Sequence, residues 1–309
     1  MKKHKLTAWL AAAAAGLSML GGTLPQAAVT ASAAGNCQME YLDRGISAIN
    51  TGSGMLVSWR FLANDSDSAV FQLYRNNTLI YTSNAGESTC YLDGSGKSTD
   101  QYRVDTVENG KVVSTSNCTM ISNQNYFQIN LDPPTGSGCT YSPNDCSVGD
   151  VDGDGMYEIF MKWDPSNSKD NSQKGKTGNV FIDCYRLDGT RLWRIDLGKN
   201  IRAGAHYTQF FVADFDCDGK AEMTCKTADG TVDGKGKVIG DASKDYRNSN
   251  GYVLSGPEYY TLFDGSTGAA LDTVNYEPSR GTVSKWGDSY GNRVDRFWGT
   301  VAYLDGSKP

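Results

Sequence analysis

Asp150-Val-Asp-Gly-Asp-Gly-Met-Tyr-Glu158 places three carboxylates two residues apart, a glycine at the sixth position and a glutamate at the ninth. The same spacing returns 64 residues later in Asp214-Phe-Asp-Cys-Asp-Gly-Lys-Ala-Glu222. Alternate side chains on a sharply turned backbone can converge and supply the many oxygen ligands that calcium prefers, whereas magnesium requires stricter geometry and fewer protein oxygens. An acidic surface turn is the alternative for one such loop. Two loops with identical spacing favour two calcium sites.

The expected metal ligands lie at alternate positions of these two loops, and one acid before the first loop is added because it can complete a coordination shell. An EF-hand would place a glutamate at the twelfth position within a helix. Met161 and Cys225 occupy that position here, and short apolar runs follow each ninth-position glutamate, which favours β-strands. The repeat therefore predicts a β architecture. The expected ligands are Asp150, Asp152, Asp154, Met156, Glu158, Asp214, Asp216, Asp218, Lys220, Glu222 and Asp145.

Residues 1–34 are typical of an export signal. Three lysines precede an apolar, alanine-rich run from Leu6 to Leu20, and Ala31-Ser-Ala33 offers a cleavage site with small residues. A membrane anchor is the alternative, but the run is short for one. We therefore expect a secreted, extracellular and monomeric protein that has no membrane association after cleavage. Its formal net charge of −6 argues against nucleic-acid binding.

All eight cysteines follow the leader, and an even number in an exported protein permits disulfides whose pairing the sequence does not reveal. Cys90 with Cys118, and Cys139 with Cys146, are plausible local pairs, with unpaired buried thiols as the alternative. His206 is the one histidine outside the leader, so a zinc site with several histidines is excluded. A Gly-x-Ser-x-Gly nucleophile motif is also missing from the sequence.

Residues 35–128 are predicted to form a small β-sandwich. Alternating apolar residues indicate short strands at 54–60, 69–75 and 78–82. Asn76-Asn77 and Asn109-Gly110 are typical of tight hairpin turns between such strands. About ninety residues of strands and turns fit a sandwich, and the pattern around Trp59 and Tyr74 resembles a fibronectin type III module.

Residues 129–309 are predicted to form the first blades of a β-propeller. Asp188-Gly189 and Asp264-Gly265 indicate hairpins, and Asp305-Gly306 begins a third such turn. A unit of acidic loop, strand, hairpin and strand that repeats in this way is typical of propeller blades. The segment is long enough for two or three blades, whereas closure requires at least about four. We therefore expect an incomplete propeller.

Six stretches of the chain carry long and specific residue combinations. They are 142–150 (SPNDCSVGD), 162–167 (KWDPSN), 200–210 (NIRAGAHYTQF), 226–231 (KTADGT), 253–258 (VLSGPE) and 286–297 (WGDSYGNRVDRF). These stretches resemble the rhamnogalacturonan lyases of polysaccharide lyase family eleven. The resemblance implies a secreted enzyme that pairs a sandwich with an eight-bladed, calcium-rich propeller. It also implies β-elimination in the rhamnose–galacturonate backbone of pectin, with this chain covering the amino-terminal half of such an enzyme.

The implied chemistry requires a base that removes the proton beside the uronate carboxylate and positive charge that stabilises the resulting enolate-like state. Lys226, His206 and Arg293 are the candidate catalytic residues within the chain, although the base can also lie beyond residue 309. A structural histidine is the alternative for His206. Asn144, Asp164 and Arg202 are the candidate substrate-binding residues. A turn-forming role is the alternative for the first two of these.

Two other classes of function share the same features. One is a non-catalytic, calcium-stabilised propeller used in adhesion, and the other is a carbohydrate-binding fragment without its catalytic blades. A pectic polysaccharide is the expected partner of a lyase and of a carbohydrate-binding fragment. Only a lyase would generate an unsaturated product from rhamnogalacturonan.

Overall fold

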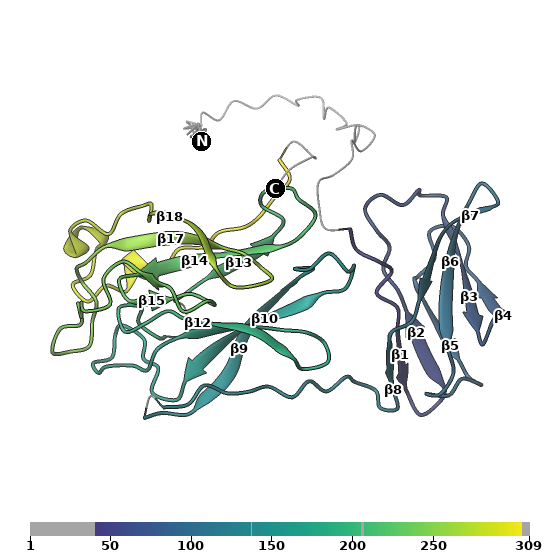
Figure 1. The fold of residues 1–309 in the computed structure, drawn as a ribbon, viewed down its shortest axis with the longest axis horizontal. Helices are drawn as coiled ribbons and strands as arrows, with labels where there is room; N and C mark the ends of the chain where they lie inside the picture. Colours follow the sequence, from purple (N-terminus) through teal and green to yellow (C-terminus); the bar gives the residue numbers. More distant parts are fainter. Residues whose placement is uncertain (1–40, 137, 205–206, 305–309) are drawn as a thin grey trace, which may run out of the picture. The chain divides into compact units, whose positions relative to one another are not determined.

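The computed structural model describes residues 41–136, 138–204 and 207–304, and it confirms the expected all-β class (Figure 1). Within these residues the only helical segments are two short 3-10 turns, η1 (Val283–Trp286) and η2 (Arg293–Asp295). No helix among them has the length and apolar character needed to cross a bilayer. The expected export signal, Cys37, His206 and the expected hairpin at residues 305–306 lie outside the described residues.

The first region is a sandwich of two four-stranded sheets with the orders β5-β2-β1-β8 and β4-β3-β6-β7. Strands β1 and β8 are parallel and the other neighbours are antiparallel. Alternate residues of both sheets, such as Val57 in one and Leu73 in the other, are fully buried in one shared core. The strands are β1 (Ser47–Asn50), β2 (Met55–Ser58), β3 (Val70–Arg75), β4 (Thr78–Thr82), β5 (Cys90–Asp93), β6 (Tyr102–Glu108), β7 (Lys111–Asn117) and β8 (Met120–Ser122).

Two hairpins of this sandwich turn where the sequence predicts. Asn76 and Asn77 have φ values of 48° and 66° between β3 and β4, and Asn109 and Gly110 have values of 48° and 73° between β6 and β7. Two successive left-handed residues are what a two-residue turn needs to match the twist of its strands. Asparagine and glycine tolerate this conformation better than other residues.

The second region contains two antiparallel sheets with the orders β16-β15-β12-β11-β10-β9 and β13-β14-β17-β18. Neither sheet closes on itself among the described residues. The hairpin β15–β16 follows β14 in the chain, yet it pairs with β12 of the first sheet. The strands are β9 (Tyr141–Gly149), β10 (Glu158–Pro165), β11 (Phe181–Tyr185), β12 (Arg191–Asp196), β13 (Phe210–Ala213), β14 (Glu222–Ala228), β15 (Thr231–Val232), β16 (Val238–Ile239), β17 (Glu258–Phe263) and β18 (Ala270–Asn275).

The sequence repeat corresponds to a structural repeat in this region. Each acidic loop joins the first and second strands of a sheet, β9 to β10 and β13 to β14. Each ninth-position glutamate begins the second strand, and each Asp-Gly pair joins the third strand to the fourth. The two sheets share one apolar core, to which Phe160, Trp193, Met223 and Phe263 contribute. This core fixes the two acidic loops within one body.

The disulfides suggested as local pairs do not form. Cys90, Cys118 and Cys146 are unpaired thiols, which excludes both suggested pairs. The Cys118 thiol instead donates to the carbonyl oxygens of Ile46 and Met120 at 3.3 and 3.4 Å. Short separation in sequence was a poor guide, because a disulfide requires Cβ atoms that face each other.

Replacing Trp193 by phenylalanine is expected to lower the free energy of unfolding by about 1–3 kcal/mol. The buried Trp193 Nε1 donates to the carbonyl oxygen of Gly265 at 2.7 Å, and phenylalanine would leave this carbonyl without its partner. Urea denaturation measures the change. The control is Trp298→Phe at a side chain that is 83% exposed, where a change within about 0.5 kcal/mol is expected. Equal losses in both variants would contradict this role of Trp193.

Candidate functional site

The first acidic loop folds around the carboxylate of Asp150. This carboxylate is fully buried and accepts hydrogen bonds from the backbone amides of Gly153 at 2.7 Å and Gly155 at 2.8 Å. Glu158 is also buried and accepts from the amide of Val151 at 3.0 Å. These bonds draw the start and the end of the loop together. The loop backbone is therefore held in place by its own acids.

The second loop repeats this arrangement. Asp214 is buried and accepts from the amides of Asp218 at 3.0 Å and Gly219 at 2.9 Å. Glu222 accepts from the amide of Phe215 at 2.8 Å, as Glu158 does from the amide of Val151. The sixth-position glycines have φ values of +88° in the first loop and +95° in the second. Such left-handed positions explain why glycine recurs there.

The donor set of both loops fits a hard divalent cation. Carboxylate oxygens of Asp150, Asp152 and Glu158 lie within 4.8 Å of one another, and those of Asp214, Asp216 and Asp218 do so in the second loop. Oxygen atoms alone form both groups, which suits calcium better than a soft metal. The seventh-position residues Met156 and Lys220 can contribute only through their backbone carbonyls, as in other calcium loops.

Burial, together with neighbouring acids, raises the pKa values of several loop carboxyl groups when no cation is bound. Burial raises the pKa of Glu158 to about 7, and the nearby Asp152 adds to this effect. Burial likewise raises the pKa of Glu222 to about 7, with a contribution from Asp216. Burial and Asp218 raise the pKa of Asp216 as well. A bound divalent cation would favour the ionised carboxylates and so offset the cost of burying several negative charges together.

The metal-free protein is expected to lose stability as pH rises from about 4.5 to 7. Glu158 and Glu222 have folded-state pKa values of about 7, above their ordinary 4.5, so the folded state holds more protons than the unfolded state in this range. Stability falls with rising pH wherever the folded state binds more protons than the unfolded state. Melting temperatures measured across this range with a chelator, and again with saturating calcium, test the effect. A chelated protein whose stability rises with pH would contradict it.

Asn144 and Asp145 lie near the middle of β9, and Asp164 lies near the end of β10 that is away from the first acidic loop. Asn144 is exposed. Asp145 accepts from the Nζ atom of Lys162 at 2.5 Å, so we leave Asp145 out of the proposed ligand set. Asp164 accepts from the Ser168 hydroxyl at 3.0 Å. The side chains of Asn144 and Asp145 thus face solvent near a buried lysine.

Arg202 is occupied by the protein itself. Its side chain is buried and donates to the carbonyl oxygens of Gly251 at 2.6 Å, Gln173 at 2.7 Å and Gly175 at 2.9 Å. Its guanidinium also lies 5.2 Å from the ring centroid of Tyr252. We therefore interpret Arg202 as a residue that organises the surrounding loops and leave it out of the proposed substrate contacts.

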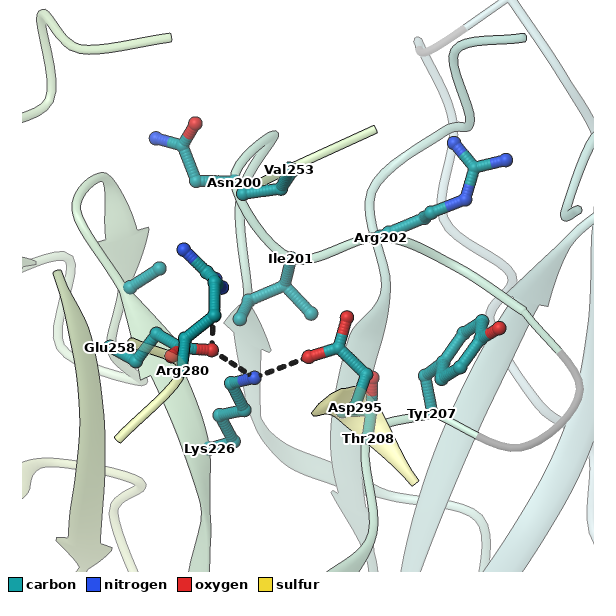
Figure 2. Close-up of a pocket in the computed structure, with 11 residues that line it drawn as sticks. Asn200, Ile201, Arg202, Tyr207, Thr208, Lys226, Val253, Glu258, Arg280 and Asp295 are labelled. Carbon is teal, nitrogen blue, oxygen red and sulfur yellow. Dashed lines mark hydrogen bonds and ion pairs between the residues drawn. The ribbon is translucent and has the colours of Figure 1, made fainter. Parts of the chain in front are cut away.

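Lys226 lies at the centre of a buried group of charges (Figure 2). Its Nζ atom pairs with Asp295 at 2.6 Å and with Glu258, which in turn pairs with Arg280 at 2.8 Å. Burial lowers the pKa of Lys226, but Asp295 and Glu258 outweigh burial and raise it overall. Lys226 is therefore a cation over the physiological pH range, which suits stabilisation of negative charge and not proton removal.

The cavity beside Lys226 is small. Its volume is about 30 Å³, enough for one or two water molecules and too small for a sugar ring. Thr208 lines this cavity with a buried hydroxyl that has no hydrogen-bond partner among the described residues, and its backbone has a left-handed φ of 65°. A β-branched residue in this conformation is strained, and such strain is often found at functional sites.

The remaining candidates are separate from this group. Arg293 is exposed and its amide donates to Asp288 at 2.8 Å. Glu258 and Asp295 were not singled out from the sequence, because their partner Lys226 is 32 and 69 residues away, and Arg280 was not because its partner is Glu258. Lys162 was also missed, although the sequence contains a signal for it. Lys162 and Lys226 each stand four residues after the glutamate of an acidic loop.

Two family models match the chain. The model of the rhamnogalacturonan lyase family 11 C-terminal domain matches residues 126–309, and the model of the rhamnogalacturonan I lyase beta-sheet domain matches residues 37–121.

The chain belongs to rhamnogalacturonan lyase family 11.

Individual relatives support this membership. The chain is 57% identical over 278 residues to the rhamnogalacturonan endolyase YesW of Bacillus subtilis and 54% identical to the exolyase YesX of the same strain. Each match covers 88% of this chain and 45% of the relative, so the chain spans less than half the length of these curated relatives.

Solved structures of the family are similar to this fold. The rhamnogalacturonan lyase of Bacillus licheniformis matches with a TM-score of 0.82 at 56% identity, over 90% of this chain and 48% of that structure. The structure of YesW matches with a TM-score of 0.82, and that of YesX with 0.81. These matches extend across both the sandwich and the second region.

Proposed function

We propose that this protein is a rhamnogalacturonan lyase that cleaves the rhamnose–galacturonate backbone of pectin by β-elimination. The 57% identity to YesW over 278 residues carries this proposal, because it spans the sandwich and both acidic loops. Identities of 57% to an endolyase and 54% to an exolyase favour neither mode of cleavage.

We also infer that calcium is the cofactor and that it binds in the two acidic loops. The converging carboxylates and the raised pKa values of Glu158 and Glu222 support this inference. The repeat of acidic loop, strand and Asp-Gly hairpin supports a propeller built from these two sheets, and the sandwich supports the resemblance to fibronectin type III. The leader sequence supports secretion, with an extracellular and monomeric enzyme as the proposal.

Lys226 is the proposed source of positive charge for the enolate-like state. Its raised pKa keeps it protonated, and a preorganised cation near the uronate would stabilise developing negative charge. In this structure Asp295 and Glu258 neutralise the ammonium group of Lys226, so Asp295 would have to move away when substrate binds. Asn144 and Asp164 remain the proposed contacts to sugar hydroxyls. We assign the proton-abstracting base to no residue.

Incubation of the protein with rhamnogalacturonan, followed by ultraviolet absorbance of the unsaturated uronate, tests the proposal. A rising absorbance is expected, and polygalacturonate without rhamnose serves as the control polymer that should give no product. Binding of rhamnogalacturonan without absorbance would instead support a carbohydrate-binding protein. Indifference to both polymers would support an adhesion propeller and would overturn the lyase proposal.

A further inference from the structure

Lys162 and Lys226 occupy equivalent positions in the two sheets. Each lies on the second strand of its sheet, four residues after the glutamate of the acidic loop. Both side chains are largely buried, with exposures of 6% for Lys162 and 15% for Lys226. Each also donates to a residue further along the chain. Lys162 contacts the Tyr207 carbonyl, after β12, at 3.5 Å, and Lys226 contacts Asp295, after β18, at 2.6 Å.

The two lysines differ in the charge that surrounds them. Lys226 has two carboxylate partners, Glu258 and Asp295, whose side chains are 7% and 17% exposed. Lys162 pairs with Ile182 as Lys226 pairs with Tyr260, so the apolar Val180, two residues before Ile182, corresponds in the chain to Glu258, two residues before Tyr260. Lys162 therefore lacks the buried carboxylate of its counterpart. Its one ion-pair partner among the described residues is Asp145, whose side chain is 60% exposed.

A β-bulge brings polar side chains to Lys162. Met161 pairs with Cys146 and Trp163 pairs with Pro143, so two residues of β9, Asn144 and Asp145, lie opposite the single Lys162. A regular antiparallel ladder would put only one residue opposite Lys162, with the next one on the other face. Bulges commonly re-aim side chains beside functional sites. The bulge thus combines a buried cation with an exposed amide and an exposed carboxylate.

We propose that Lys162 binds the galacturonate carboxylate of the substrate, and that Asp145 occupies its ammonium group until the substrate displaces it. This assignment rests on the proposed function and adds a specificity-determining residue to it. Among the described residues Lys162 has one carboxylate partner beside the Tyr207 carbonyl, and its buried ammonium needs such a carboxylate because an unpaired buried charge is unfavourable. An exposed carboxylate such as Asp145 leaves that partner at little cost, because water solvates it readily. Asn144, next to Asp145 on the bulge, would then face the same sugar.

Calorimetric titration with two oligosaccharides tests the assignment. One is a rhamnogalacturonan oligosaccharide, and the other is the same molecule after reduction of its uronate carboxylates to alcohols. Lys162→Met is expected to weaken binding of the carboxylated molecule by about tenfold to a hundredfold, as for the loss of a hydrogen bond to a charged group. It should leave the affinity for the reduced molecule unchanged. Asp145→Asn is expected to strengthen binding of the carboxylated molecule several-fold, because it removes the internal competitor.

An ordinary exposed ion pair supplies the matched controls. Lys244 and Asp241 pair at 3.9 Å with side chains that are 53% and 50% exposed, and Lys244→Met and Asp241→Asn should leave both affinities unchanged. Circular dichroism shows whether Lys162→Met folds; if it does not, Asp145→Asn decides the question. Asp145 is exposed, so a purely structural ion pair predicts no gain in affinity from that variant.

The outcomes separate this assignment from the lyase proposal. The role of Lys162 would be overturned if Lys162→Met lost affinity for both oligosaccharides equally, or if Asp145→Asn gained no affinity. It would also be overturned if the unaltered protein did not bind the carboxylated molecule. If the carboxylate-dependent changes appear while no unsaturated product forms, the assignment stands and the lyase proposal fails. If product forms and Lys162→Met binds both molecules like the unaltered protein, the lyase proposal stands and the assignment fails.

Discussion

Replacing Lys226 by methionine is expected to lower the free energy of unfolding by about 3–5 kcal/mol, because it leaves buried carboxylates without their cation. Among the described residues, Glu258 would keep Arg280 as its cationic partner, whereas Asp295 would lose its one ion-pair partner. Methionine retains most of the side-chain volume, so the loss reports on charge and not on packing. Chemical denaturation measures it.

Lys244→Met is the matched control for this variant. Lys244 pairs with Asp241 at the surface, where ion pairs contribute about 0–1 kcal/mol. The triple variant Lys226→Met, Glu258→Gln, Asp295→Asn should recover part of the stability that Lys226→Met loses. A loss in Lys226→Met no larger than in Lys244→Met would show that the charges around Lys226 are not coupled to folding.

Removal of calcium is expected to have an effect of similar size or larger. A ligand that binds only the folded state stabilises it by about 4 kcal/mol per site at a concentration one thousand times its dissociation constant. Two occupied loops would therefore raise the melting temperature markedly, and a chelator would reverse the rise. Differential scanning calorimetry with calcium, with chelator and with calcium restored measures the change.

The double variant Asp150→Asn, Asp214→Asn distinguishes the loops from other sites. Both carboxylates are buried at the centre of their loops, and each accepts hydrogen bonds from two backbone amides. Asparagine keeps the shape of the side chain but loses its charge, so the response to calcium should disappear. Asp188→Asn, at an exposed hairpin between β11 and β12, should leave the response intact. A calcium response that survives in the double variant would place the ions elsewhere.

Much of the local structure could be predicted because it depends on backbone conformation. The hairpins at Asn76-Asn77 and Asn109-Gly110, and the sixth position of each acidic loop, need left-handed residues, and the sequence supplies asparagine and glycine there. The glutamates that begin β10 and β14 were equally visible, because apolar residues follow them directly. These signals lie within a few residues of one another in the chain.

The side-chain partners could not be predicted, because they come from distant segments. Arg202 looked available for a polysaccharide, yet carbonyl groups from residues 173, 175 and 251 already accept from it. Sequence gives no indication of whether an arginine serves a ligand or the protein's own loops. The charges around Lys226 and the bulge opposite Lys162 arise only when strands pair. The equal spacing of both lysines from their acidic loops was the one available signal.

The hairpin β15–β16 makes the two sheets of the second region interdependent. It is inserted between two strands of the second sheet but hydrogen-bonds to β12 of the first, and the Thr231 hydroxyl adds a bond to the Leu197 carbonyl at 2.9 Å. Asp233, next to β15, accepts from the amide of Ala270 at the start of β18 at 3.0 Å. Neither sheet can therefore come apart without breaking bonds that anchor its neighbour. Hydrogen exchange should consequently find β12 and β14 opening together as one cooperative unit.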